Sequence, residues 1–317
     1  MADGWDVDGA PALASCGAGA DRVMPFSVGA VTDEFSPDSL DTALGAMAGL
    51  GMTFAELRIV DGRNIIDHTD AEVDRIRARA EARGMRVLSI ASPLLKCTLP
   101  DAPPVASGIR QDMFSSAFAF EDQPRLAERA FEIAERAGAS IVRVFSYWRT
   151  VDPGGCLDRV ASALSDLAVA AAERGLIVGL ENEHACNVAT GAECARLLRA
   201  VDHPAVGIIW DPANAFVAGE IPFPDGYRHI PPSRIVHVHA KDCTVSGHVP
   251  IFGPLGGMGV DWRGQLSALA QDGYRGTISL ETHWNGPDGD KFQGSMICGR
   301  ALNEMVRAVG PNHSHEA

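Results

Sequence analysis

The sequence predicts an α/β fold, a single (β/α)8 TIM barrel, and three observations support this prediction. Short β-branched runs alternate with amphipathic stretches along most of the 317 residues, the pattern that βα units with a parallel sheet produce. Eight such runs are present, whereas an open doubly wound sheet usually has about six strands. No linker-like stretch divides the chain. We therefore expect one barrel domain over residues 26–309 and flexible tails at 1–25 and 310–317.

Each element follows from local composition. Strands are expected where β-branched residues concentrate, at 27–32, 53–59, 86–92, 140–146, 176–182, 205–211, 234–240 and 276–282. Helices are expected between them, at 38–50, 70–83, 123–137, 157–174, 190–201, 262–272 and 290–308. Ser36-Pro37-Asp38 is typical of a helix start, and Gly84, Gly138 and Gly175 are typical of helix ends. The segment 216–233 is too rich in proline for a long helix.

Charge and cysteine content exclude several classes of protein. With 27 Lys and Arg against 41 Asp and Glu, the formal charge is −14, which disfavours binding to nucleic acid or to an anionic membrane surface. No stretch approaches the roughly 18 apolar residues of a membrane span. The N-terminal region lacks the features of a secretory signal, and seven cysteines without a Cys-x-x-Cys pair are typical of free thiols. We therefore expect a cytoplasmic protein.

Polar residues gather at the ends of the last four predicted strands. Side chains of a barrel strand alternate between the lumen and the helix layer, so polar residues at the last inward positions point into the catalytic face. The groups that share a face are Glu181 with Glu183, Ile209 with Asp211, His237 with His239 and Lys241, and Ser279 with Glu281 and His283.

A cation site is the simplest interpretation of these strand ends. A single acid at a strand end is more often a helix cap or a solvated charge. Three carboxylates and one imidazole from successive strands instead form an oxygen-rich set that suits Mn²⁺, Mg²⁺ or Co²⁺ and can also hold Zn²⁺. Without a cation, such crowded carboxylates would raise one another's pKa.

These strand ends also carry a family resemblance. The series Leu-Glu-Asn, Trp-Asp-Pro-x-Asn, His-x-His-x-Lys-Asp and Leu-Glu-Thr-His, within residues 26–308, resembles the sugar phosphate isomerase/epimerase-like group of xylose isomerase-like TIM barrels. The resemblance implies four metal ligands, Glu181, Asp211, His239 and Glu281, and one divalent ion. Mn²⁺ is the ion we expect first, with Mg²⁺, Co²⁺ or Zn²⁺ as alternatives.

The resemblance also implies a reaction. In the ketose 3-epimerases of this superfamily, the two glutamate ligands exchange a proton with the carbon beside the sugar carbonyl through a metal-stabilised enediolate. Glu181 and Glu281 would be that catalytic pair here. Two positions depart from the ketose-epimerase pattern, because Asn214 stands where those enzymes usually have a substrate-binding histidine and Val245 where they tend to have an arginine.

Further polar and aromatic residues are candidates for substrate binding. They lie in or after the second, fourth, fifth, sixth, seventh and eighth strands, and we expect contacts from Arg58, Trp148, Arg149, Glu183, Asn214, His237, Lys241 and His283. For several of them a structural role is an open alternative, such as an ion pair of Lys241 with Glu183 or Asp242. The loop 253–259 could cradle a phosphate through its backbone N–H groups, but a Gly-rich loop covering the site fits its sequence better.

We therefore expect a divalent-metal-dependent sugar isomerase or epimerase acting on a small carbohydrate. The main alternative is a lyase or dehydratase that uses the same site to eliminate a substituent from a 3-oxo-glycoside or related keto-sugar. A non-catalytic sugar-binding barrel and an endonuclease IV-type enzyme are remoter alternatives, the latter because of the −14 charge. Homo-oligomerisation is left open.

Overall fold

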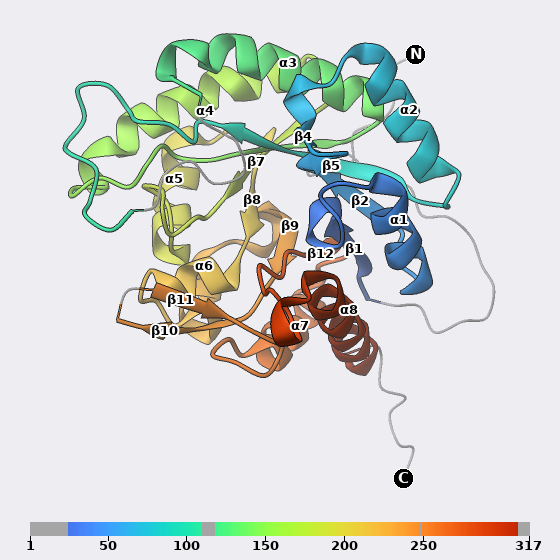
Figure 1. Ribbon diagram of the computed structural model, residues 1–317. Coiled ribbons are helices and arrows are strands. Elements are labelled where there is room, and N and C mark those ends of the chain that lie inside the picture. The colour runs from blue at the N-terminus through green and yellow to red at the C-terminus, as the bar shows by residue number, and fades with distance from the viewer. Residues whose placement is uncertain (1–24, 110–117, 248, 310–317) are drawn as a thin grey trace.

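The centre of the structure is a closed parallel barrel (Figure 1). The computed structural model describes residues 25–109, 118–247 and 249–309. Within them the barrel strands, in spatial order, are β1 (Ser27–Val31), β12 (Thr277–Leu280), β9 (Ile235–Ala240), β8 (Val206–Trp210), β7 (Ile177–Glu181), β6 (Ile141–Val144), β5 (Arg86–Leu94) and β2 (Phe54–Leu57). Each strand overlaps a predicted one, so the barrel fold is confirmed. The expected tails lie, apart from residue 25, outside the described residues.

Helices surround the barrel at the predicted positions (Figure 1). They are α1 (Leu40–Gly49), α2 (Asp70–Glu81), α3 (Gln123–Ala137), α4 (Leu157–Ala172), α5 (Gly191–Val201), α7 (Trp262–Gln271) and α8 (Lys291–Ala308). The start of α1 differs from the expectation, because the side chain of Ser39, not Ser36, accepts a hydrogen bond from the backbone N–H of Thr42. At the end of α3, Gly138 adopts the expected left-handed conformation, with φ of 71°.

Several short elements were not expected. A short helix, α6 (Pro212–Val217), begins one residue after β8, and the side chain of the intervening Asp211 caps it. Two hairpins extend from strand ends, β3 (Ile59–Val60) with β4 (Arg63–Asn64) and β10 (Cys243–Ser246) with β11 (Val249–Phe252). Short 3₁₀ turns, with one π turn at Pro222–Gly226, lie at Thr32–Glu34, Ile65–Asp67, Phe120–Asp122, Gly154–Cys156, Tyr227–His229, Pro232–Arg234 and Pro287–Gly289. The proline-rich segment therefore forms turns, as its composition predicts.

Two apolar clusters define where polar side chains can gather. The main core joins the helices to the outside of the barrel. A separate small cluster contains Phe54, Leu88, Ile141 and Ile209, from four different barrel strands, and fills part of the lumen. Glu56 and Asp211 each lie two residues after a member of this cluster, so strand alternation places them on the same inward face, nearer the carboxyl ends of the strands.

Two further observations concern the chain as a whole. Among the described helices, none combines the length and the apolar character that crossing a membrane requires. The cysteines in the described residues, Cys97, Cys156, Cys186, Cys194, Cys243 and Cys298, are free and buried.

Candidate active site

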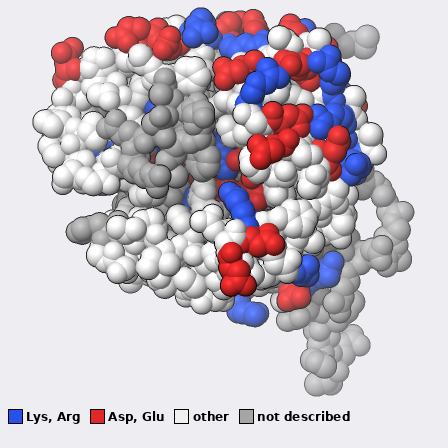
Figure 2. Space-filling model, in the orientation of Figure 1, with Lys and Arg blue, Asp and Glu red and all other residues white. Residues whose placement is uncertain are grey.

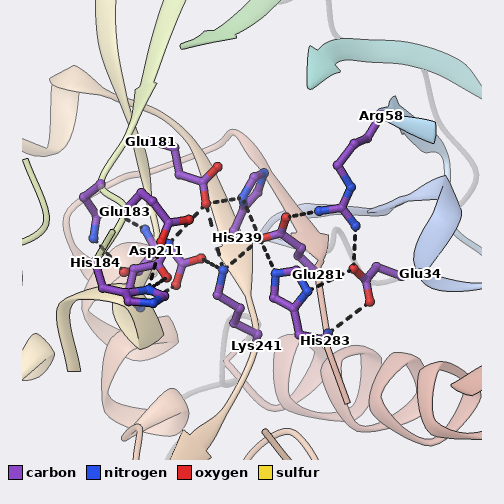
Figure 3. A network of polar contacts seen from close by, with 12 residues as sticks. Glu34, Arg58, Glu181, Glu183, His184, Asp211, His239, Lys241, Glu281 and His283 are labelled. Atoms are coloured by element: carbon purple, nitrogen blue, oxygen red, sulfur yellow. Dashed lines mark hydrogen bonds and ion pairs between the residues drawn. The ribbon is translucent and has the colours of Figure 1, made fainter. Parts of the chain in front are cut away.

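Four residues that follow one another around the barrel converge at the carboxyl ends of their strands (Figure 3). Glu181 ends β7, Asp211 directly follows β8, His239 lies in β9 and Glu281 directly follows β12. One ligand atom from each lies within 4.8 Å of the others, and all four side chains are buried. His239 Nδ1 is 3.4 Å from Glu181 Oε1 and 3.4 Å from Glu281 Oε2. The structure thus brings together the four ligands that the resemblance implies.

Two atoms of this group are incompletely satisfied. His239 Nδ1 is buried and takes part in no hydrogen bond. Asp211 Oδ1 accepts a hydrogen bond from the backbone N–H of Asn214, whereas the buried Asp211 Oδ2 has an ion pair with Lys241 in place of a hydrogen bond. A buried polar atom without a partner carries a free-energy cost that a bound ligand would relieve. Three carboxylates and one imidazole with such atoms turned inward fit a divalent cation.

Cationic side chains of this chain partly balance the carboxylates. Lys241 Nζ lies 2.6 Å from Asp211 Oδ2 and 2.8 Å from Glu281 Oε2, so its main partners are not the Glu183 or Asp242 considered from the sequence. Burial, together with the neighbouring Glu181 and Glu281 carboxylates, raises the pKa of Asp211 to about 6. Lys241 opposes this rise only in part. Burial alone would also raise the pKa of Glu281, but Lys241 and nearby imidazoles hold it well below its ordinary value.

Two arginines anchor the outer oxygens of the two glutamates. Arg143 Nη1 lies 3.1 Å from Glu181 Oε2 and 3.6 Å from Glu281 Oε1. Arg58 Nη1 lies 2.6 Å from Glu281 Oε1, and the same guanidinium group also contacts Asp33 and Glu34. Each glutamate therefore has one oxygen fixed by an arginine and the other turned toward His239 Nδ1.

A second chain of contacts leads away from Glu181. Asn214 Nδ2 donates to Glu181 Oε1 at 3.2 Å, and Asn214 Oδ1 lies 3.1 Å from His184 Nδ1. His184 Nδ1 is also 2.8 Å from Glu183 Oε1, and Lys96 Nζ lies 3.5 Å from Glu183 Oε2. Burial alone would lower the pKa of His184, but the Glu183 carboxylate raises it above its ordinary value.

The other residues expected to bind substrate lie in different surroundings. His283 lies beside Glu34 and Glu281, 3.6 and 3.7 Å away, and Trp148 faces the Lys96 ammonium, 5.7 Å from its ring centroid. Arg149 instead pairs with Glu193 of α5 at 3.0 Å. His237 bonds to Glu56. Whether any of these residues touches a substrate stays a prediction.

The glycine-rich loop after β11 has a structural partner for its backbone. The Asp242 carboxylate accepts hydrogen bonds from the backbone N–H groups of Cys243, Gly256, Met258 and Val260, at 2.9 to 3.1 Å. These N–H groups are therefore already bonded to a carboxylate, which argues against their use as a phosphate cradle.

Several residues of the site were not expected from the sequence. Asp33 and Glu34 directly follow the first predicted strand, so the strand-end rule applied to the other strands would have found them. Arg143 shares its strand face with Phe145, which alternation also shows. His184 follows its strand at a position whose direction the alternation does not fix.

The fold and the strand-end group define a class of protein, the TIM barrels that carry three carboxylates and an imidazole at their carboxyl face. Residues 44–301 match the family model described as the xylose isomerase-like TIM barrel, and the chain belongs to this family. The resemblance inferred from the strand-end motifs is thereby confirmed.

Three known proteins illustrate the relationship. A 3-dehydroshikimate dehydratase of Pseudomonas putida is 32% identical over 165 residues, which cover 49% of this chain and 25% of the dehydratase. The chain thus spans about a quarter of that relative's length. Two solved structures share the fold. An IOLI protein with a bound zinc atom has a TM-score of 0.69 and 15% identity, and the match covers 89% of this chain and 99% of that protein. A D-allulose 3-epimerase from Methylomonas sp. has a TM-score of 0.65 and 18% identity, and the match covers 89% of this chain and 97% of the epimerase.

Proposed function

We propose that the protein is a divalent-metal-dependent isomerase or epimerase that moves a proton at the carbon next to the carbonyl of a keto-sugar. The observation that carries this proposal is the matched pair Glu181 and Glu281. Each has an arginine on its outer oxygen, while its other oxygen lies 3.4 Å from His239 Nδ1. Two carboxylates fixed in this way suit the removal of a proton by one and its return by the other.

The metal ligands in this proposal are Glu181, Asp211, His239 and Glu281. A divalent cation, when bound, would polarise the substrate carbonyl as a Lewis acid and so acidify the neighbouring C–H bond. Mn²⁺ is our first choice, and Mg²⁺, Co²⁺ or Zn²⁺ suit the same oxygen-rich set. The zinc-bound fold relative supports a divalent ion without selecting one.

The chain's own residues would supply the rest of the chemistry. The arginines Arg58 and Arg143 keep the glutamates in place, since each contributes a short ion pair to an oxygen that would not react. Lys241, at 2.8 Å from Glu281, lies where it can neutralise negative charge that develops on a substrate oxygen. Asn214 donates to Glu181 and can also orient a sugar hydroxyl.

Proton exchange in D₂O tests this function. The purified protein is incubated with Mn²⁺ and a panel of keto-sugars, and deuterium is located by NMR. We expect exchange at the carbon next to the carbonyl, with epimer or isomer formed and no leaving group released. Glu281→Gln should lower the exchange rate about 10²- to 10⁴-fold, whereas Glu132→Gln on the outer surface should not change it. A wild-type protein that binds no divalent ion, or catalyses no exchange, would contradict the proposal.

Elimination is the second candidate, and two observations favour it. The Pseudomonas putida relative is a dehydratase at 32% identity. The Glu183 carboxylate raises the pKa of His184, whose Nδ1 lies 3.1 Å from Asn214 Oδ1, and an elimination needs an acid for the leaving group, a role that His184 would fill. Release of water or an aglycone in the same experiment would identify a lyase, and His184→Gln should then slow release more than C–H exchange.

The expected partner in either case is a small carbohydrate. The structure neighbours include an epimerase for a ketose, which supports a substrate of that class. A cytoplasmic location follows from the cysteine pattern and, like the oligomeric state, stays a prediction.

A further inference from the structure

A second buried polar group lies in the lumen directly beside His239. It consists of Glu56 from β2, His237 and His239 from β9, and the hydroxyl groups of Ser89 and Thr277. Glu56, His237 and His239 have no measurable exposure to solvent. The proposed reaction uses only His239 among them, so the role of the others is open.

Glu56 is the centre of this group. Its carboxylate accepts a hydrogen bond from Ser89 Oγ at 2.5 Å and lies 2.9 Å from His237 Nε2. His239 Nε2 lies 3.2 Å from Glu56 Oε1 and 3.4 Å from Oε2. An ionised carboxylate can only accept hydrogen bonds, so each imidazole nitrogen that faces it must carry a proton.

This arrangement determines which nitrogen of His239 is available to a metal. With the Nε2 proton directed at Glu56, the lone pair of a neutral imidazole resides on Nδ1. Nδ1 is the atom that lies 3.4 Å from both Glu181 and Glu281, and it is buried without a hydrogen-bond partner. A histidine that binds a metal through one nitrogen commonly donates its other N–H to a carboxylate, which fixes the ring and makes it a stronger ligand.

The position of Glu56 is itself well fixed. Ser89 and His237 contact it from β5 and β9, and His237 Nδ1 is in turn 2.5 Å from Thr277 Oγ1 of β12. The carboxylate is therefore supported from three other strands of the barrel. A side chain held in this way can hold another side chain in a single orientation.

We propose that Glu56 is a positioning residue that orients His239 so that Nδ1 faces the metal site. The inference rests on the proposed metal-dependent function and adds a residue that contacts neither the substrate nor the cation. It predicts that Glu56 controls the affinity of the protein for the ion, apart from any effect on the reaction.

Glu56→Gln tests this role with little change in shape. A glutamine amide has one acceptor oxygen and one donor NH₂ group, so it cannot accept from His237, His239 and Ser89 together. We expect Mn²⁺ to bind the variant roughly 10- to 100-fold more weakly than the wild type, measured by titration calorimetry. Ser279→Ala is the matched control, because Ser279 pairs in register with His239 and its buried hydroxyl has no hydrogen-bond partner. Its Mn²⁺ affinity should equal that of the wild type.

A measurement on the wild-type protein keeps the proposal testable if the variant does not fold. NMR of the ¹⁵N-labelled, Zn²⁺-loaded protein identifies which imidazole nitrogen of His239 is bound to metal, and we expect Nδ1, with the proton on Nε2. Zinc on Nε2, or a folded Glu56→Gln variant with wild-type Mn²⁺ affinity, would overturn the proposal. If the wild type binds the ion as described and yet exchanges no proton on any keto-sugar, the proposed function fails while the role of Glu56 stands.

Discussion

Ionic networks occur in two very different regions of this protein, the mouth of the barrel and the outer surface of α2 and α3. In the barrel mouth Arg58 lies 2.6 to 2.8 Å from Asp33, Glu34 and Glu281, and these side chains are at most 4% exposed. On the surface Arg136 lies 2.8 to 2.9 Å from Asp70 and Asp74, with side chains 38% to 56% exposed. Figure 2 shows charges of both signs interleaved over this part of the surface.

The comparison shows that distance alone does not set the strength of an ion pair. The two networks have nearly equal distances between nitrogen and oxygen, so the difference between them lies in their access to water. Water and salt screen the surface pairs, which typically contribute no more than about 1 kcal/mol each. A buried charge that loses its partner has no water to replace it, so removal of one partner is far more costly.

The largest expected effect follows from Arg58→Met. This change leaves Asp33, Glu34 and Glu281 without their shared guanidinium group in a buried site. We expect the free energy of unfolding to fall by about 3 to 5 kcal/mol, measured by urea denaturation at pH 7. A loss below about 1 kcal/mol would show that the two regions do not differ as described.

The second-largest effect is expected in the pH dependence of stability, to which Glu34 should contribute. Burial alone would raise its pKa, but His283, Lys291 and Arg58 lower it to about 2, from an ordinary value of 4.5. A carboxyl group whose folded-state pKa is lowered contributes stability above its unfolded-state pKa and loses it as pH falls through the folded-state value. Between about pH 4.5 and pH 2 we expect Glu34 to account for a loss of about 3 kcal/mol, which Glu34→Gln should abolish in urea unfolding curves.

Glu72 provides the surface control for that measurement. Hydrogen bonds from Thr69 and Arg63 lower its pKa to about 2 as well, but it lies on the outside of α2. Because water screens these contacts, Glu72→Gln should change the pH dependence much less than Glu34→Gln. Equal changes in the two variants would contradict the comparison.

A smaller effect is expected from Lys241→Met on metal binding. The Lys241 ammonium group occupies the space beside Asp211 Oδ2 and Glu281 Oε2, two of the oxygens that would hold the cation. Removal of this positive charge should tighten Mn²⁺ binding about 10-fold, which corresponds to about 1.4 kcal/mol. Lys291→Met is the control, since Lys291 contacts Glu34 at the edge of the network and should alter the affinity less. Weaker binding by Lys241→Met would show that the lysine supports the site.

The smallest effect belongs to Arg136→Ala on the surface. This change removes the ion pairs of Arg136 with the exposed carboxylates of Asp70 and Asp74, and it should lower the free energy of unfolding by no more than about 1 kcal/mol. The effect should shrink further in 1 M NaCl, because salt screens exposed charges. A larger loss, or one that salt does not reduce, would place this network in the same class as that of Arg58.

The sequence predicts the barrel and the convergence of four polar side chains at its carboxyl face for a definite physical reason. Strand alternation and the β-branched runs are local properties, and a closed parallel barrel brings the carboxyl ends of all strands to one face. The convergence of these strand-end side chains can therefore be predicted without knowing how the loops fold, and it includes Glu181, Asp211, His239 and Glu281. The catalytic roles assigned to two of them are not tested by this convergence.

The hydrogen-bond partners of an inward-facing side chain, and its depth in the barrel lumen, are much harder to predict from the sequence. His237 and His239 share one strand face and both lie beside Glu56, but only His239 also lies within the four-residue group of Glu181, Asp211 and Glu281. Alternation gives the face of a residue and leaves its neighbours across the barrel undetermined. Contacts made by loops also join residues that are not neighbours in sequence, as the hydrogen bonds that Asp242 accepts from the backbone N–H groups of Gly256 and Val260 illustrate.

The hydrogen bonds of Asp242 also have a consequence for protein engineering. One carboxylate holds both ends of the segment from Cys243 to Val260, because Asp242 accepts hydrogen bonds from the backbone N–H groups of both residues. Val245, Val249 and Ile251 on this hairpin are exposed rather than packed into the core. We therefore expect substitutions on this exposed face of the hairpin to be tolerated better than substitutions of Asp242, whose carboxylate holds the backbone N–H groups of Gly256 and Val260.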